Sequence, residues 1–206
     1  MHVDDSFTAT RRSLHGVAEL LLAGPQHAAC GKITLRTVAG GFGTTHTPDL
    51  RVEGGSLVAG DRRADIDART PRDLGEELGI VPRTLDDVYS DGSGVGLDDR
   101  LEVRAADAAR LAAAFAVGDA ALRAVAPDIT PVLWPEHFDI GISVGEVNYG
   151  VSPGDTTIRG PYMYVGPWQP PPVDDFWNQP FGVARELPES TEDVVAFFEE
   201  ARTRLS

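Results

Sequence analysis

The sequence predicts an α+β fold in which helices pack on one face of an antiparallel β-sheet. Three observations predict it. Apolar residues recur at the helical period in several segments, other short segments alternate apolar and polar residues, and brief glycine-containing turns separate the alternating segments. Neighbouring strands joined by short turns pair antiparallel. Helices that come before, between and after such strands bury their apolar stripes against the sheet.

The helices are predicted from apolar stripes and from capping residues. The first covers residues 10–23, where apolar side chains fall at i, i+3, i+4, i+7 and i+8, and Gly24 with Pro25 is expected to end it. The other helices show either a capping signal or an apolar stripe of their own, and they cover residues 70–79, 107–125 and 190–205.

The strands are predicted from alternation. Residues 32–37 alternate apolar and polar side chains as a half-buried strand does, and the glycines of residues 40–43 are expected to turn the chain into a second strand. The clearest strand pair covers residues 137–144 and 146–151. The remaining short strands are expected at residues 50–52, 56–58, 64–67 and 162–165.

The length and composition predict a single domain over residues 1–206. The chain has 42% hydrophobic and 24% charged residues, as globular proteins do, and it contains no internal repeat and no linker. Its net charge is −14, with 18 basic residues against 32 acidic ones, so neither nucleic acid nor an anionic membrane surface is expected as a partner.

The remaining composition signals concern location. No apolar stretch approaches the length of about 18 residues that a membrane span needs. Cys30 is the only cysteine, so no intrachain disulfide is expected, and the first five residues lack the apolar run of a signal peptide. A cytoplasmic location is therefore predicted.

Residues 137–139 hold the first candidate site. Because alternate residues of a strand share a face, His137 and Asp139 are expected to project together, away from the apolar core stripe. Glu146 and Asn148 join that face if the next strand pairs back in a hairpin. Such a set supplies a general acid–base pair or three ligands of a divalent metal. The alternative is the solvated face of a half-buried hairpin.

Aromatic residues and prolines gather in the same part of the chain. Nine of the 15 prolines lie between residues 131 and 180. Rigid rings and prolines over a sheet can build a pocket for a planar or sugar-like ligand at low entropic cost. The alternative is a loop whose rings pack on the core. The residues expected to line the pocket are Trp134, Asn148, Tyr149, Tyr162, Tyr164, Trp168 and Trp177.

The first predicted helix places His15 and Glu19 one turn apart beside its apolar stripe. With His137 they make another candidate site, and the alternative is a surface pair or a capped histidine at the core boundary. Residues 91–102 match a calcium loop in part, but Val95 occupies a position that needs an oxygen ligand. No metal is therefore assigned.

Five stretches of the sequence carry a family resemblance: Leu133–Asp139, Glu146–Asp155, Phe176–Gly182, Ser13–His15 and Gly40–Thr44. Together they resemble a family of uncharacterised actinobacterial proteins, over nearly the whole chain. The order of these blocks is also similar, more distantly, to a broader bacterial domain of unknown function. The resemblance implies an outline of helices and strands, and it assigns no catalytic residue.

Three functions follow from these signals. The favoured one is binding of a small molecule in an aromatic-lined pocket, with His137, Asp139, Glu146 and Asn148 orienting the ligand. The second is a hydrolase or isomerase in which His137 is the general base and Asp139 or Glu146 sets its tautomer or binds a metal. The third is a protein-interaction module formed by the loop over residues 162–181. Binding is favoured because no complete nucleophile–base–oxyanion set is present. No particular cofactor or oligomeric state is indicated.

Overall fold

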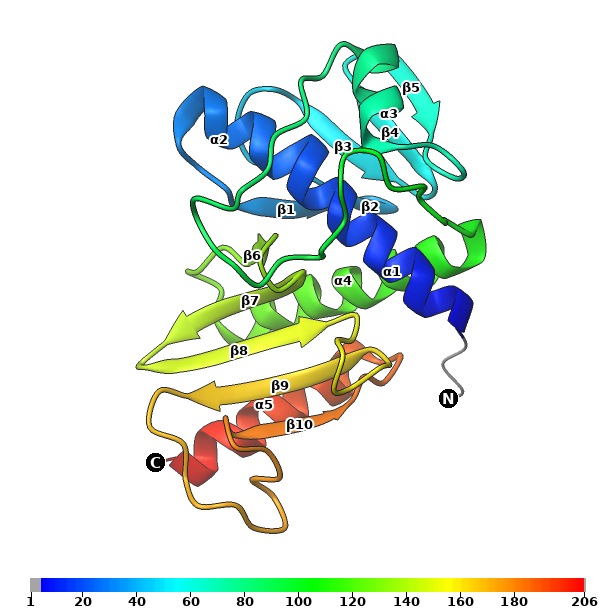
Figure 1. The fold of residues 1–206 in the computed structure, drawn as a ribbon. Coiled ribbons are helices and arrows are strands. Elements are labelled where there is room, and N and C mark those ends of the chain that lie inside the picture. Colours follow the sequence, from blue (N-terminus) through cyan, green and yellow to red (C-terminus); the bar gives the residue numbers. More distant parts are fainter. Residues whose placement is uncertain (1–4, 206) are drawn as a thin grey trace. The chain divides into compact units, whose positions relative to one another are not determined.

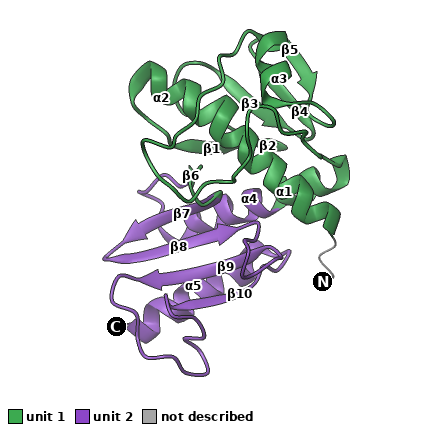
Figure 2. Cartoon of the chain, viewed as in Figure 1, with its two compact units in different colours: residues 1–113, 133–138 green, residues 114–132, 139–206 purple. Residues whose placement is uncertain are grey.

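The computed structural model describes residues 5–205 and confirms the α+β class. The described chain forms two compact units (Figure 2). Unit 1 contains the chain up to residue 113 together with residues 133–138, and unit 2 contains residues 114–132 and the chain from residue 139 onward. Every strand pair within a unit is antiparallel. That all 206 residues form a single domain stays a prediction.

Unit 1 contains six strands in the order β6-β1-β2-β3-β4-β5. Two-residue turns join β1 to β2, β3 to β4 and β4 to β5, and a five-residue segment joins β2 to β3 in the predicted meander. The first turn lies at residues 39–40, whereas the sequence predicted it over residues 40–43. Gly40, with a φ of 74°, makes that turn, so Gly41 and Gly43 belong to the second strand. The strands are β1 (Leu35–Val38), β2 (Gly41–Thr44), β3 (Leu50–Glu53), β4 (Ser56–Ala59), β5 (Arg62–Asp65) and β6 (Val132–Trp134).

The helices of unit 1 bury one face of this sheet. α1 (Asp5–Val17), the π-helical η1 (Ala18–Ala23) and α2 (Gly24–Cys30) form one continuous run (Figure 1). η1 contacts β2 and β3, and α3 (Pro71–Leu78) contacts β4 and β5. The buried residues of this face include Leu35, Phe42, Leu50, Val52 and Leu57.

The predicted helix end at Gly24 and Pro25 is wrong. Gly24 keeps a right-handed helical φ of −62°, and its N–H donates to the carbonyl of Glu19 across a π-turn. Pro25 therefore enters in the first turn of a new α-helix, where its missing N–H breaks no hydrogen bond. The helix ends instead at Gly31, whose φ is 72°.

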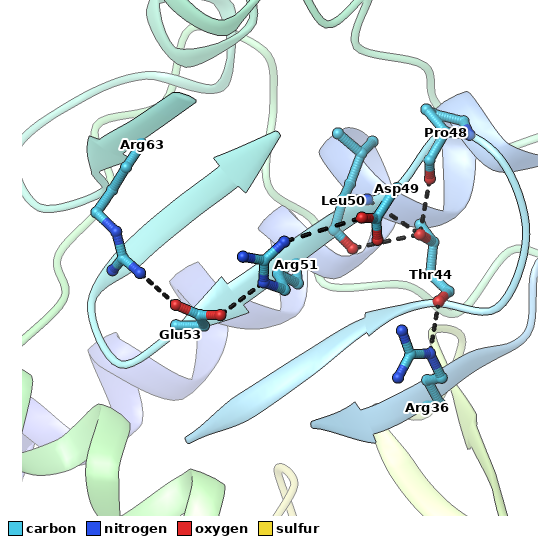
Figure 3. Close-up of polar contacts among 8 residues, drawn as sticks. All are labelled: Arg36, Thr44, Pro48, Asp49, Leu50, Arg51, Glu53 and Arg63. Atoms are coloured by element: carbon cyan, nitrogen blue, oxygen red, sulfur yellow. Dashed lines mark hydrogen bonds and ion pairs between the residues drawn. The ribbon is translucent and has the colours of Figure 1, made fainter. Parts of the chain in front are cut away.

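The other face of the unit 1 sheet carries a row of arginines. Arg36, Arg51 and Arg63 lie directly in register on β1, β3 and β5. Figure 3 shows the carboxylate of Glu53 accepting hydrogen bonds from both Arg51 and Arg63. Arg36 turns instead to the backbone and donates to the carbonyl of Thr44 at 3.0 Å.

Gln26 joins the helical run to the sheet of unit 1. Its side chain is fully buried, and its Nε2 donates to the carbonyls of Lys32 and Thr34, both at 2.9 Å. Its Oε1 accepts from the backbone N–H groups of Thr45 and His46, both at 2.8 Å. One buried amide thus fixes α2 to the start of β1 and to the segment after β2.

The irregular segment between α3 and α4 (Ala105–Val125) lies along α1 and η1. The N–H of Ser93 donates to the carboxylate of Glu19 at 2.9 Å, and the N–H of Glu102 donates to the hydroxyl of Ser13 at 2.9 Å. Ser13 and Glu19 are buried, and their side chains accept hydrogen bonds from backbone N–H groups of this segment, as buried polar groups usually do.

Unit 2 contains four strands in the order β10-β9-β8-β7. Its elements are β7 (Asp139–Val144), β8 (Val147–Ser152), β9 (Tyr162–Pro167), β10 (Val183–Glu186), α5 (Thr191–Leu205) and the part of α4 (Ala105–Val125) from residue 114 onward. β7 and β8 form the predicted hairpin through Gly145 and Glu146, both at positive φ, as in a two-residue type I′ turn.

α4 and α5 pack on the same face of the unit 2 sheet (Figure 1). A Cβ built on Gly118 of α4 would lie 2.8 Å from Val151 and 3.0 Å from Ile140, so this helix approaches the strands closely. Tyr149 of β8 packs edge-on against Phe198 of α5, with ring centroids 5.7 Å apart. Within unit 2, helices on one face of an antiparallel sheet are confirmed. No helix in residues 5–205 has the length and apolar character needed to cross a membrane.

Candidate functional site

His15 of α1 is held on three sides within unit 1. Its ring stacks on that of Phe138, with centroids 5.0 Å apart and planes 4° apart. Its Nε2 lies 2.6 Å from the carbonyl oxygen of Pro135 and 3.8 Å from Oε1 of Glu19. Because a carbonyl oxygen only accepts, Nε2 carries the proton and Nδ1 keeps its lone pair.

The surroundings of His15 favour the neutral form of its imidazole. Burial lowers the pKa of His15, and the charges of Arg11 and His137 act in the same direction. The Glu19 carboxylate and the Pro135 carbonyl raise this pKa, but burial has the larger effect. The side chain of His15 is 16% exposed, so its Nδ1 is an oriented hydrogen-bond acceptor at the edge of the core.

Glu19 is itself oriented by its neighbours. Its Oε1 accepts from the Tyr89 hydroxyl at 3.1 Å, and its Oε2 accepts from the N–H of Ser93. A Cβ on Gly92 would lie 2.1 Å from Oε1, so a glycine is required for this approach. Burial, followed by the Glu19 charge, raises the pKa of Tyr89 and keeps its hydroxyl a donor. The π-helical turn η1, which carries Glu19, is a feature that recurs at functional sites.

The turn over residues 135–138 places His137 differently from the prediction. Phe138 has a φ of 51° and β7 begins only at Asp139, so the alternation expected across residues 137–139 is wrong. His137 is exposed and lies near enough to His15 for its charge to lower the pKa of that residue. Trp134, at the end of β6, is 40% exposed in the same unit.

The strand register gives unit 2 a second face, opposite the one that α4 and α5 cover. We call it the polar face. Directly paired residues share a face, so Gly141, Gly150 and Tyr164 form one row across β7, β8 and β9. On β7, β8 and β9, the polar residues of this face are Asp139, Ser143, Asn148, Ser152, Tyr162 and Tyr164.

The ring of Tyr164 crosses two neighbouring strands on the polar face. Its hydroxyl donates a short hydrogen bond to Oδ2 of Asp139. A Cβ on Gly150 would lie 2.5 Å from the ring, and one on Gly141 would lie 3.4 Å from the hydroxyl. The two glycines therefore make room for the ring. Burial, and then Asp139, raises the pKa of Tyr164, so its hydroxyl stays protonated.

Tyr162 is also engaged by a carboxylate. Its hydroxyl donates to Oδ2 of Asp155 at 2.6 Å, while Oδ1 of Asp155 accepts from the N–H groups of Thr157 and Ile158. Burial, and then this hydrogen bond, raises the pKa of Tyr162. The predicted residues Tyr162, Tyr164 and Asp139 thus share a face, but their polar atoms bond to one another or to the loop after β8.

Asn148 offers a different arrangement on the same face. Its Oδ1 accepts from the Ser143 hydroxyl at 2.7 Å and from the indole N–H of Trp168 at 3.4 Å. An indole N–H only donates, so the oxygen of the amide faces Trp168 and the Nδ2 group faces away. Among residues 5–205, Nδ2 has no hydrogen-bond partner. It is available to an outside acceptor.

The rings around Asn148 are accessible. Trp168 is 63% exposed, and Phe181, which packs edge-on against Tyr164 at 6.3 Å, is 42% exposed. We call Ser143, Asn148, Tyr164, Trp168 and Phe181 together the Asn148 site. Sequence reasoning missed Ser143 and Phe181 as site residues. The pairing of Ser143 with Asn148 was the available signal, since a two-residue hairpin fixes it.

Other predicted residues lie away from the Asn148 site. Tyr149 and Trp177 are buried at 3% and 5% exposure, and Tyr149 points toward α5 on the opposite face. Asp139 and Glu146 lie at opposite ends of the β7–β8 hairpin, separated by about 17 Å at the rise of a strand. These two carboxylates therefore do not meet in one site.

Asp99, which matches the calcium pattern, is used in other contacts. It accepts from the N–H of Gly96 at 3.0 Å and lies 3.5 Å from the guanidinium of Arg12. In the described chain, no group of three or more His, Cys, Asp or Glu side chains is arranged to hold a metal ion.

Comparison of the chain with protein-family models, with curated proteins and with solved structures finds no match. The resemblance to actinobacterial proteins stays a prediction.

Proposed function

We propose that the protein binds a small neutral molecule with a planar or sugar-like ring at the Asn148 site. The observation that carries this proposal is the fixed amide of Asn148. Its oxygen is held by Ser143 and Trp168, and its Nδ2 group is left to donate outward. An oriented donor beside exposed rings is the arrangement by which proteins fix a ring and one of its polar substituents.

The neighbouring rings support a ring-shaped ligand. Trp168 presents most of its indole to solvent and is tethered at its N–H, so it offers a stacking surface whose conformational freedom is already reduced. Its backbone is fixed as well, because its N–H donates to the carbonyl of Glu146 at 2.9 Å. The amide donor selects a carbonyl or hydroxyl oxygen on the ligand.

The hydrolase or isomerase alternative receives less support. It needs a carboxylate that orients His137, and Asp139 accepts instead from Tyr164, while Glu146 lies at the far end of the hairpin turn. A cytoplasmic location belongs to the proposal and is supported by the single, exposed Cys30.

The proposal is tested by a thermal-shift screen of nucleosides, aromatic amino acids and mono- and disaccharides. The proteins are the wild type, Asn148→Leu and Trp168→Ala, with Trp134→Ala as the matched control because Trp134 is exposed in unit 1. A compound present at about a hundred times its dissociation constant should stabilise the wild type and the control by about 2.7 kcal/mol. It should not stabilise the two site variants.

Two results would refute the proposal. One is a screen in which no compound raises the melting temperature of the wild type. The other is a compound that stabilises Asn148→Leu and Trp168→Ala as much as the control, because its site would then lie elsewhere.

A further inference from the structure

A proline-rich segment protrudes from unit 2 between two fixed ends. It comprises Gln169, Pro170, Pro171, Pro172 and Val173, and we call it the proline strut. Four of these residues are exposed, with Val173 at 65% exposure, and the fifth is half-buried. The strut lies outside the Asn148 site, and the proposed small-molecule binding uses none of its residues.

Both ends of the strut are tied to the body of unit 2. On one side, the N–H of Trp168 donates to the carbonyl of Glu146 at 2.9 Å. On the other side, the N–H of Asp174 donates to the carbonyl of Trp177 at 3.0 Å, and Oδ1 of Asp174 accepts from the N–H groups of Phe176 and Trp177, both at 2.7 Å. The strut therefore spans two anchored points.

The anchor on the second side is buried. Phe176 and Trp177 are each 5% exposed, with ring centroids 4.9 Å apart. The guanidinium groups of Arg185 and Arg204 lie over the Phe176 ring at 4.8 Å and 4.2 Å. Because this end is packed against the core, a partner that binds the strut meets an already ordered segment and does not have to order a loop.

Proline chemistry fixes the conformation of the strut. Each proline ring holds φ near −65°, and each residue that precedes a proline is kept out of the α region. Gln169, Pro170 and Pro171 all precede a proline. Pro170 and Pro171 each carry both restrictions and are therefore held in the polyproline II conformation, which has three residues per turn and no internal hydrogen bonds.

The strut offers ring surfaces and carbonyl oxygens to a partner. Three consecutive prolines carry no N–H, so the segment cannot add as a strand to the edge of a sheet. Its carbonyls make no backbone hydrogen bond in residues 5–205. Segments in the polyproline II conformation are bound in grooves lined with aromatic side chains, whose indole and phenol groups donate to the carbonyls.

We propose that the proline strut docks into an aromatic-lined polyproline groove of a partner protein, with a basic side chain of that groove contacting Asp175. Asp175 directly follows the anchor residue Asp174, is exposed, and makes no ion pair within the described chain. The net charge of −14 favours a partner whose groove is bordered by basic residues.

The test uses purified polyproline-binding domains of the SH3, WW and EVH1 classes as probes, measured by biolayer interferometry against the full chain. At least one domain should bind the wild type with a dissociation constant below about 1 mM. The double variant Pro170→Ala/Pro172→Ala should weaken that binding at least tenfold, and Pro180→Ala, at an exposed proline outside the strut, should leave it unchanged. Asp175→Lys should weaken binding and reduce its sensitivity to salt.

The outcomes separate this proposal from the proposed function. It is overturned if none of the three domain classes binds, if the double variant binds as well as the wild type, or if sedimentation shows that the strut instead mediates association of two copies of this chain. Loss of binding in Asn148→Leu with full binding in the double variant also overturns it, because the contact would then lie at the Asn148 site. An unchanged melting temperature of the double variant shows that the variant is folded.

Discussion

At the scale of single residues, His15 shows how burial prepares a side chain for chemistry. Its Nε2–H is committed to the Pro135 carbonyl, and its ring is fixed by Phe138, which leaves one lone pair at the edge of the core. Glu19, whose Oε1 lies 3.8 Å from Nε2 of His15, is fixed in turn by Tyr89 and Ser93. An imidazole oriented in this way has the form of a general base.

The lowered pKa of His15 predicts a dependence of stability on pH. At pH values between the folded pKa and the unfolded value of 6.5, the unfolded chain binds a proton that the folded protein does not bind. The free energy of unfolding should therefore fall as the pH drops below about 6.5, by at most about 1.4 kcal/mol per pH unit for this one group. Urea denaturation at a series of pH values measures the slope.

His15→Gln should reduce that slope on the acid side. His46→Gln, at an exposed position outside the cluster, controls for the substitution itself. An NMR titration of the His15 imidazole gives an independent check, and a midpoint at or above 6.5 would contradict the assignment.

The residues of this cluster were only partly predictable. The spacing of His15 and Glu19 on a helix was visible in the sequence, because residues one turn apart share a face. Tyr89 was not, because it lies 70 residues from Glu19 in an irregular segment, and no periodicity reports where such a segment runs. Gly16 was a weak indication that another segment packs closely on this helix, because Val95 fills the space that a side chain at Gly16 would occupy.

At the scale of elements, the β7–β8 hairpin determines which residues of unit 2 meet. Its type I′ turn sets the register, and the register places Asn148 beside Ser143 and Gly150 beside Gly141. The alternation in the sequence was sufficient to predict this hairpin. It was not sufficient to predict the start of β7. Phe138 has a positive φ, so the alternation of side chains does not extend from β7 back to His137.

Replacement of Gly150 tests how closely Tyr164 covers the hairpin. Gly150→Ala would place a Cβ 2.5 Å from the ring, so the ring must move and its hydrogen bond to Asp139 must lengthen. We expect a destabilisation of about 1–3 kcal/mol, measured by urea denaturation.

Gly166→Ala is the matched control on the same face. A Cβ at Gly166 would have its nearest neighbour at 3.5 Å, which is an ordinary contact, so this variant should lose no stability. Equal stability of the two variants would show that Tyr164 does not occupy the position described.

At the scale of the whole molecule, charge is the property that the sequence defines best. The excess of 14 negative charges is spread over the chain, and many arginines are paired with carboxylates, as in the Arg51–Glu53–Arg63 network of Figure 3. The expectation that nucleic acid and anionic membranes are not partners rests on this composition and stays a prediction. Composition did not foretell that the described chain forms two compact units, because no linker or change in composition marks the division.

The charge predicts that duplex DNA will not bind. Non-specific binding requires basic side chains that displace counterions from phosphates, and typical dissociation constants are about 1–100 µM. The anisotropy of a labelled duplex should stay constant with protein up to about 100 µM at low salt. A rise in anisotropy that is reversed by added salt would show a basic surface that the net charge conceals.

The buried amide of Gln26 has a consequence for local opening of unit 1. The backbone amide hydrogens of Thr45 and His46 lie in a bend outside any strand, where rapid exchange with deuterated solvent is usual. Both are bonded to a side chain that is fully covered by its surroundings. Their deuterium uptake should therefore follow the detachment of α2 from the sheet. Two amides in an exposed bend thus report on the movement of a helix.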